Sequence, residues 1–134
     1  MKKSLFIVAL ALGFAVSTVN AKNTVTTLNN LNIVKTKTSV SPFCASIAKG
    51  DIETVKKLIE LGADVNKKSN GMTPVMYAAK FNRVAILKLL VANGAELDKK
   101  CDKGYTAEKY AELSNAQDAL KAISEITDKK NRKA

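Results

Sequence analysis

Side chains that could do chemistry are few in this sequence. Its 134 residues include no histidine and only two cysteines. There is no Gly-rich phosphate loop, no Gly-x-Ser-x-Gly, and no Cys-x-x-Cys or His-containing cluster with metal-ligand spacing. Without histidine, the commonest general base is missing as well. We therefore expect a protein that is not an enzyme, that needs no cofactor or metal, and whose function is binding.

Lysine is abundant and unevenly distributed. The formal net charge is +10, with clusters at Lys67-Lys68, Lys99-Lys100 and Lys103. Four more basic residues lie near the C-terminus: Lys129, Lys130, Arg132 and Lys133. Such clusters favour an anionic partner, although charge runs often only solvate a surface. Nucleic acid is not expected as the partner, because aromatic residues for base stacking make up only 5% of the sequence.

The first 21 residues have the pattern of a Sec signal peptide. Lys2 and Lys3 precede an apolar stretch that runs to about Val19, and the stretch is followed by Asn20 and the small residue Ala21. We expect cleavage after Ala21 and a periplasmic or secreted protein. The alternative is an uncleaved membrane anchor, because the apolar stretch approaches the roughly 17 residues that span a bilayer.

Residues 22–40 differ in composition from the rest of the chain. Asn, Thr and Lys dominate this segment, and its apolar residues keep neither helical nor strand spacing for long. We expect a polar linker that is largely extended or disordered. A basic tail is expected at the other end of the chain, at residues 128–134.

From Ser41 onward the sequence repeats itself. Four pairs of residues are 32 positions apart: Ser41 and Thr73, Pro42 and Pro74, Leu58 and Leu90, and Gly62 and Gly94. A third copy comes after them at a spacing of 33, which relates Gly71 to Gly104 and Thr73 to Thr106. This register predicts a repeat domain over residues 41–127, with units at about 41–67, 68–100 and 101–127.

Each unit predicts two antiparallel helices and a projecting turn. Ser41 or Thr73 can cap a first helix, and the following proline occupies the first helical position, where its missing N–H costs nothing. A second helix follows with aliphatic residues on its buried side. Gly62 and Gly94 come just after the last apolar residue, where a left-handed backbone ends a helix. Polar, lysine-rich residues then lead to the next glycine, as a hairpin would.

Residues 71–98, GMTPVMYAAKFNRVAILKLLVANGAELD, closely resemble the ankyrin repeat. They are similar to the family pattern of Gly-x-Thr-Pro-Leu-His, an alanine pair, an aliphatic helix and Gly-Ala-Asp-Val-Asn. The resemblance covers about residues 41–126. It implies an all-α ankyrin-repeat solenoid of helix-turn-helix units with projecting hairpin fingers. It also implies that a protein partner docks on the concave surface formed by the fingers and the first helices.

The sequence departs from the family pattern in three respects. The family's buried histidine is replaced by Cys44, Met76 and Lys109 in the three units, so its usual hydrogen bond is missing. The third unit has Ala107 in place of proline, and the first unit lacks a preceding finger. We expect these outer units to act as caps with one face in water.

Cys44 and Cys101 could form a disulfide in an oxidising compartment. However, stacked units are spaced by about 10 Å, which exceeds the roughly 7 Å between Cα atoms that a disulfide spans. We therefore expect two free thiols, with Cys44 as a small core residue and Cys101 exposed.

The resemblance assigns candidate partner-binding residues to the fingers and to the end of a first helix. They are Lys67, Ser69, Asn70, Met72, Lys80, Phe81, Lys100, Asp102, Lys103 and Tyr105. Phe81 is the strongest candidate, because an aromatic side chain in polar surroundings often dominates a binding interface. The alternative is that Phe81 packs under the neighbouring finger or the linker.

Two functions fit this sequence. The first is a protein–protein interaction module of the cell envelope, a monomer that binds an acidic patch of another protein through its concave surface. The second is an electrostatic binder of an anionic membrane or polysaccharide surface, through the basic fingers and tail. In either case, three repeats could be marginally stable alone and fold fully only on a partner.

Overall fold

The computed structural model describes residues 39–134, so the expected signal peptide and most of the linker lie outside the described residues. Six helices succeed one another in this part of the chain: α2 (Pro42–Lys49), α3 (Ile52–Glu60), α4 (Pro74–Lys80), α5 (Val84–Ala92), α6 (Ala107–Leu113) and α7 (Gln117–Lys133). The described residues form no strand, and a single isolated bridge joins Ser69 to Met72. The structure is therefore all-α, as expected.

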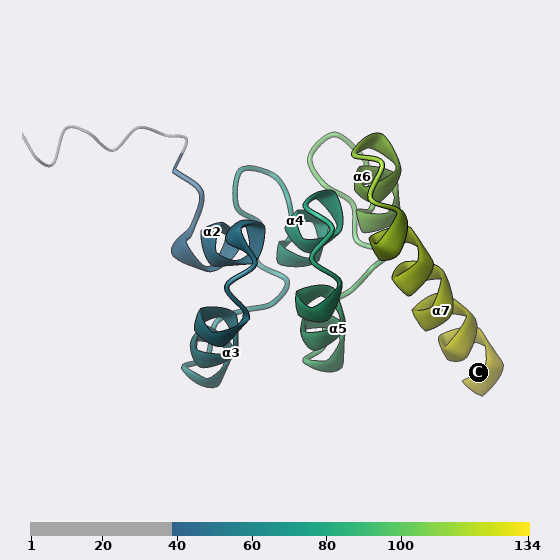
Figure 1. Cartoon of the computed structure of the whole chain (residues 1–134), viewed down its shortest axis with the longest axis horizontal. Helices are drawn as coiled ribbons and strands as arrows, with labels where there is room; N and C mark the ends of the chain where they lie inside the picture. The colour runs from purple at the N-terminus through teal and green to yellow at the C-terminus, as the bar shows by residue number, and fades with distance from the viewer. Residues whose placement is uncertain (1–38) are drawn as a thin grey trace, which may run out of the picture. The chain divides into compact units, whose positions relative to one another are not determined.

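The helices form antiparallel pairs, and the pairs stack side by side (Figure 1). In one layer α2 packs against α4 and α4 against α6, and in the other α3 packs against α5 and α5 against α7. Loops that project beside the first helices join each pair to the next (Figure 1). This arrangement is the expected solenoid of helix pairs with projecting fingers.

The first helix of each pair begins at a hydroxyl residue. The Cys44 N–H donates to Ser41 Oγ at 3.2 Å, and the Lys109 N–H donates to Thr106 Oγ1 at 3.3 Å. Both bonds satisfy amides that the first turn of a helix leaves without a partner. Thr73 differs, because its fully buried Oγ1 makes no hydrogen bond and its own N–H donates to Met76 Sδ at 3.3 Å. The middle helix α4 is therefore capped by a thioether where the family has histidine.

Left-handed residues at three equivalent positions reverse the chain within each pair. Gly50, Asn82 and Asn115 have φ angles of 83°, 55° and 53°. Glycine and asparagine adopt this conformation at the lowest cost. Asn82 also links two units, because its Oδ1 accepts the N–H of Ala119 at 2.9 Å. The reversal therefore joins the second and third helix pairs.

The second helices differ in length because of one position. Gly62 and Gly94, both with φ of 94°, come after the last residues of α3 and α5 and leave them nine residues long. The equivalent position in the third unit is Thr127, which stays helical, and its hydroxyl donates to the Ile123 carbonyl at 2.9 Å. Helix α7 therefore continues to Lys133, and most of the expected basic tail forms its last turns.

The core lies between the two helix layers and is mainly aliphatic. Helix α4 is its centre, because every residue from Pro74 to Ala79 is buried. Ala78 and Ala79 are fully buried, and their small side chains allow close packing against the flanking first helices. Among residues 39–134, no helix combines the length and the apolar content that crossing a membrane would require.

Candidate functional site

The first finger is a tight hairpin between the first and second units. Ser69 and Met72 exchange two backbone hydrogen bonds of 2.8 and 3.1 Å. The two residues between them, Asn70 and Gly71, have φ angles of 49° and 76°. Two consecutive positive φ angles define the type I′ turn, for which Asn-Gly is the preferred sequence. The local sequence therefore fixes the shape of this finger.

The second finger is longer by one residue. The Cys101 N–H donates to the Tyr105 carbonyl at 2.8 Å and closes a loop of three residues, Asp102 to Gly104. Gly104 has φ of 83°, the left-handed position that such a three-residue hairpin loop requires. The extra residue explains why the repeat spacing changes from 32 to 33.

The two fingers are joined to each other. Lys68 Nζ lies 2.9 Å from Asp102 Oδ1, and the Asp102 N–H donates to the Gly71 carbonyl at 3.1 Å. A Cβ atom on Gly71 would lie only 2.6 Å from Asp102 Oδ2, so the approach depends on glycine. Asp102, predicted as a partner-binding residue, is therefore also a structural link between fingers.

A hollow of about 230 Å³ lies between the two fingers and the helices beneath them. It is lined by Asn70, Gly71, Met72, Lys80, Cys101, Asp102, Lys103 and Tyr110. We call it the inter-finger hollow. It brings together five of the ten residues that the sequence predicted for partner binding: Asn70, Met72, Lys80, Asp102 and Lys103.

Cys101 was expected to be exposed, and this prediction is wrong. Cys101 is only 5% exposed. Its Sγ accepts hydrogen bonds from the N–H groups of Lys103 and Tyr105, both at 3.3 Å, and from the Tyr110 hydroxyl at 3.4 Å. Burial alone would raise the pKa of the Cys101 thiol, but these donors together lower it. Burial and the bond to Cys101 raise the pKa of Tyr110 to about 12, so its hydroxyl stays protonated.

The other thiol is separate from this site. Cys44 is fully buried and free, as expected, and no disulfide joins it to Cys101. Burial is the largest effect on the pKa of Cys44 and raises it. A thiol of this kind behaves as a small apolar core residue.

Tyr110 is a functional candidate that the sequence prediction left out. The repeat register relates Tyr110 to Tyr77 and Cys101 to Ser69, and each tyrosine hydroxyl donates to the residue at the start of a finger. Tyr77 donates to the Ser69 carbonyl at 3.0 Å, whereas Tyr110 donates to the Cys101 thiol. The register contained this signal, because both pairs recur at the repeat spacing.

The aromatic candidates lie outside the hollow and are partly exposed. Phe81 is 41% exposed, and Lys80 Nζ lies 5.5 Å from the centre of its ring, within the range of a cation–π contact. Tyr105 is 39% exposed and packs edge-to-face on Tyr110, with ring centres 5.9 Å apart. Phe81 therefore has the accessible surface that a hot-spot residue needs, and its role stays a prediction.

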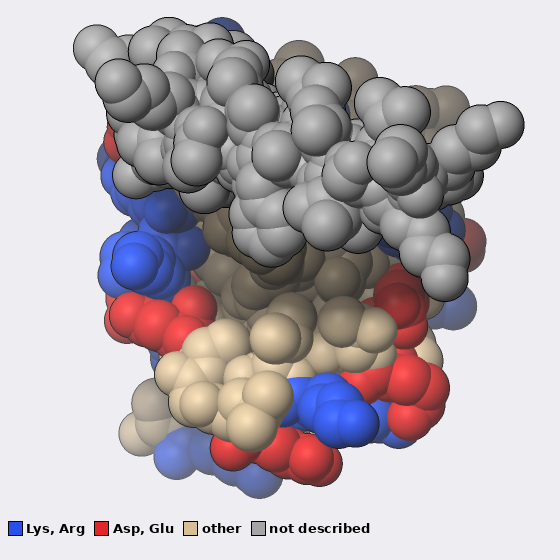
Figure 2. Space-filling model, turned by 90° about the vertical axis from the view of Figure 1, so that its left-hand side faces the viewer, with Lys and Arg blue, Asp and Glu red and all other residues tan. Residues whose placement is uncertain are grey.

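Two further candidates, Lys67 and Ser69, line a different hollow of about 430 Å³ at the end formed by the first helix pair. Ser69 Oγ accepts the Ser41 N–H there at 2.8 Å, so it holds the start of α2. Figure 2 shows this end, where uncharged side chains are bordered by acidic and basic ones. The candidates therefore do not form one site.

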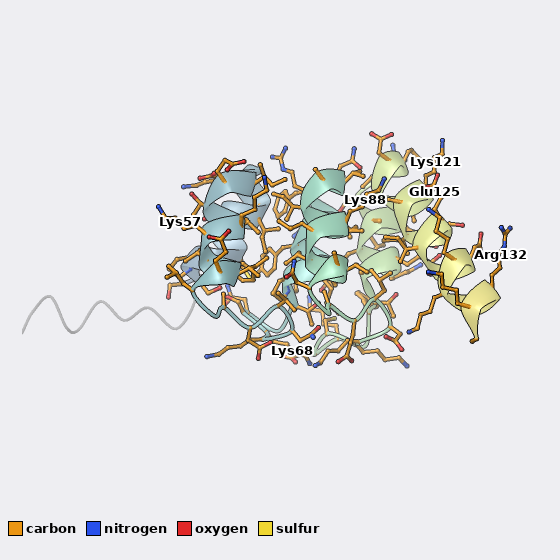
Figure 3. The ribbon with its side chains drawn as sticks, turned by 90° about the horizontal axis from the view of Figure 1, so that it is seen from below. Lys57, Lys68, Lys88, Lys121, Glu125 and Arg132 are labelled. Atoms are coloured by element: carbon orange, nitrogen blue, oxygen red, sulfur yellow. The ribbon has the colours of Figure 1, made fainter. Side chains whose placement is uncertain are left out.

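Most lysines near the fingers have no carboxylate partner. The ion pairs among residues 39–134 are Lys56–Glu53, Lys68–Asp102 and Lys109–Glu112. Lys67, Lys80, Lys100 and Lys103 are in none of them. Figure 3 shows Lys68 on the finger side of the repeat domain, and Lys57, Lys88 and Lys121 away from that side on the second helices. The finger side therefore keeps several uncompensated positive charges.

The inter-finger hollow presents two lysines, one carboxylate, one thiol and one phenol. No group of three His, Cys, Asp or Glu residues within residues 39–134 could hold a metal ion. The Cys101 thiol contacts hydrogen-bond donors, and the phenol beside it stays protonated rather than acting as a base. The described surface thus offers a recess with basic side chains and partly exposed aromatic rings.

A family model described as ankyrin repeats, in three copies, matches residues 12–101 and 43–134. This chain belongs to the ankyrin-repeat family. An ankyrin repeat protein of Rickettsia bellii is 34% identical over 97 residues, which cover 66% of this chain and 58% of the relative. A vapyrin-like protein of Medicago truncatula is 40% identical over 58 residues, 42% of this chain and 12% of the relative.

A solved structure adds a second similarity. It is that of a predatory endopeptidase from Bdellovibrio bacteriovorus in complex with an immunity protein, and one of its chains matches with a TM-score of 0.61 and 29% identity. The match covers 65% of the present ankyrin-repeat chain and 46% of that chain. In each of these comparisons our chain spans less than two thirds of the relative's length.

Proposed function

We propose that this ankyrin-repeat protein is a non-enzymatic binding module of the cell envelope that holds a protein partner against its fingers and first helices. Ankyrin repeats are protein-binding modules in general, and the N-terminal sequence favours export. The observation that carries the proposal is the inter-finger hollow, where five predicted residues meet, including two lysines without an ion-pair partner in the described part of the chain. Such a surface complements an acidic patch on the partner.

The Bdellovibrio complex supports a partner that is itself an enzyme. That complex joins an endopeptidase to an immunity protein, and the chain that matches ours does so at 29% identity. An exported endopeptidase is therefore the first class of partner to test.

The test uses residues 22–134 as bait against an envelope fraction. We expect a protein to be retained, and we expect Phe81→Ala or Met72→Ala to weaken its binding roughly tenfold or more, as for an interface hot spot. Leu61→Ala is the matched control, because Leu61 is an apolar residue 78% exposed at the C-terminal end of α3 and lines neither of the two hollows. Equal effects of Leu61→Ala and Phe81→Ala would contradict the proposed surface.

A second candidate function is electrostatic binding of an anionic membrane or polysaccharide. It is supported by the last turns of α7, where Lys129, Lys130, Arg132 and Lys133 are all exposed and none has an ion-pair partner among the described residues. Binding of this kind should collapse at high salt and be unaffected by Phe81→Ala. Binding to a folded partner should fall only moderately with salt, so a salt titration separates the two functions.

A further inference from the structure

The inter-finger hollow has the size of a site for one side chain. Its volume of about 230 Å³ is below the roughly 300–1,000 Å³ that is usual for small-molecule sites. Its walls come from both fingers and from α4 and α6, so it is a recess in the surface that the partner is proposed to cover.

Its electrostatics favour a negative charge. The hollow is lined by two lysines, Lys80 and Lys103, and by one carboxylate, Asp102. The carboxylate already pairs with Lys68 at 2.9 Å, whereas neither lining lysine forms an ion pair with any residue from 39 to 134. The partner-free hollow is therefore lined by two lysines whose charges no carboxylate of the described residues neutralises, and Lys80 also lies over the Phe81 ring.

We propose that the inter-finger hollow receives the carboxylate of one Asp or Glu side chain of the partner protein, which Lys80 and Lys103 neutralise. This inference rests on the proposed function, because it names what the partner places on the same surface. An anionic membrane is expected to bind the exposed cations of α7 instead, because anionic lipid attracts basic residues clustered on a helix.

Two capped peptides, Ac-Gly-Glu-Gly-Glu-Gly-NH2 and its Gln counterpart, provide the probe. They are titrated at millimolar concentration into ¹⁵N-labelled residues 22–134, and backbone amide shifts are recorded. The Glu peptide should shift the amides of Gly71, Asp102 and Lys103, and the Gln peptide should not. The double variant Lys80→Gln, Lys103→Gln should weaken binding of the Glu peptide roughly threefold to tenfold, as expected for the loss of two exposed ion pairs.

The matched control is the double variant Lys57→Gln, Lys88→Gln, which removes the same charge from the second helices (Figure 3). It should leave peptide binding unchanged. The inference is overturned if the Glu peptide shifts no amide resonance or if the shifted amides lie mainly in α7. It is also overturned if both double variants weaken binding of the Glu peptide equally. Vesicles of phosphatidylglycerol that shift the finger amides more than the Glu peptide does would also overturn it.

These outcomes are separate from those of the proposed function. If the captured partner depends on Phe81 and Met72 but tolerates Lys80→Gln, Lys103→Gln, the binding surface stands and the carboxylate site does not. If the Glu peptide maps to the hollow but no partner depends on Phe81 or Met72, the carboxylate site stands and the proposed function fails.

Discussion

At the scale of single residues, two sulfur atoms take roles that polar groups hold elsewhere. Met76 Sδ accepts the Thr73 N–H where the family places histidine, and it leaves the buried Thr73 Oγ1 without a hydrogen bond. Cys101 Sγ accepts three hydrogen bonds at the base of the second finger. Both arrangements predict measurable consequences, because buried polar atoms and buried thiols respond strongly to their donors.

We predict that Met76→His stabilises the protein. The N–H of a neutral imidazole can donate to Thr73 Oγ1, which gives this buried oxygen a hydrogen bond worth about 1 kcal/mol in place of the weak bond to sulfur. Urea unfolding at a pH where histidine is neutral measures the gain. Adding Thr73→Val removes the acceptor and should cancel the gain, and a destabilised Met76→His protein would show that packing of the thioether matters more.

We predict that Tyr110→Phe raises the pKa of Cys101. The variant keeps the ring contact with Tyr105 and removes the hydroxyl that donates to Sγ, so the thiolate loses a stabilising bond. Only the thiolate reacts with iodoacetamide, and its fraction grows as pH rises through the pKa. In a Cys44→Ala background, the alkylation rate of the variant should therefore rise at higher pH than that of the parent. Identical pH profiles would contradict the role of this bond.

At the scale of elements, small differences in sequence decide where each helix or hairpin ends. Two residues, Asn70 and Gly71, close the first finger, and three residues close the second. Gly62 and Gly94 end the second helices of the first two units, whereas Thr127 lets α7 run for 17 residues. One residue at a repeat position thus changes the length of an element while the register is kept.

We predict that Thr127→Gly shortens α7. Glycine inside a helix costs about 1 kcal/mol relative to alanine, and here it also supplies the left-handed conformation that ends α3 and α5. Far-ultraviolet circular dichroism should show a loss of helical signal while the midpoint of urea unfolding changes little. Thr127→Ala is the control and should keep or increase the helical signal, so an equal loss in both variants would argue against this explanation.

At the scale of the whole repeat domain, polar side chains link neighbouring helix pairs and keep them in register. The Asn66 side chain donates to the Gly94 carbonyl at 2.9 Å and accepts the Glu96 N–H at 3.0 Å. Arg83 Nε donates to the Ala48 carbonyl at 3.0 Å and links the same two pairs. Since no helix pair can bury its apolar face alone, we expect these links and the shared core to couple the unfolding of neighbouring units.

We predict that Asn66→Ala lowers the free energy of unfolding by about 1–2 kcal/mol, because two hydrogen bonds between units are lost. The matched control is Asp98→Ala. Asp98 occupies the equivalent position one unit later, and its side chain has no hydrogen bond or ion pair with the described residues. That change should stay within about 0.5 kcal/mol. Urea unfolding of both variants tests whether the loss of stability comes from contacts between units rather than from the local turn.

The candidate site could be predicted in part. The register placed Met72 and Lys103 on fingers, and the structure brings them into one hollow with Lys80. The register did not show that Lys67 and Ser69 belong to a different hollow at the first helix pair, nor that Asp102 forms an ion pair with Lys68. Those facts depend on how adjacent fingers pack against each other, which is decided by the stacking of the repeat units.

The sequence by itself determined the helix pairs, the hydroxyl residues at which the first helices begin, the left-handed ends and the fingers, because each depends on residues close together in the chain. The tertiary structure alone decided that Cys101 is buried and that Lys80 and Lys103 line the hollow with no ion-pair partner among residues 39–134. The reason is physical. Burial and charge pairing depend on contacts such as Lys68 with Asp102, which join residues 34 positions apart and form only when one unit packs on the next.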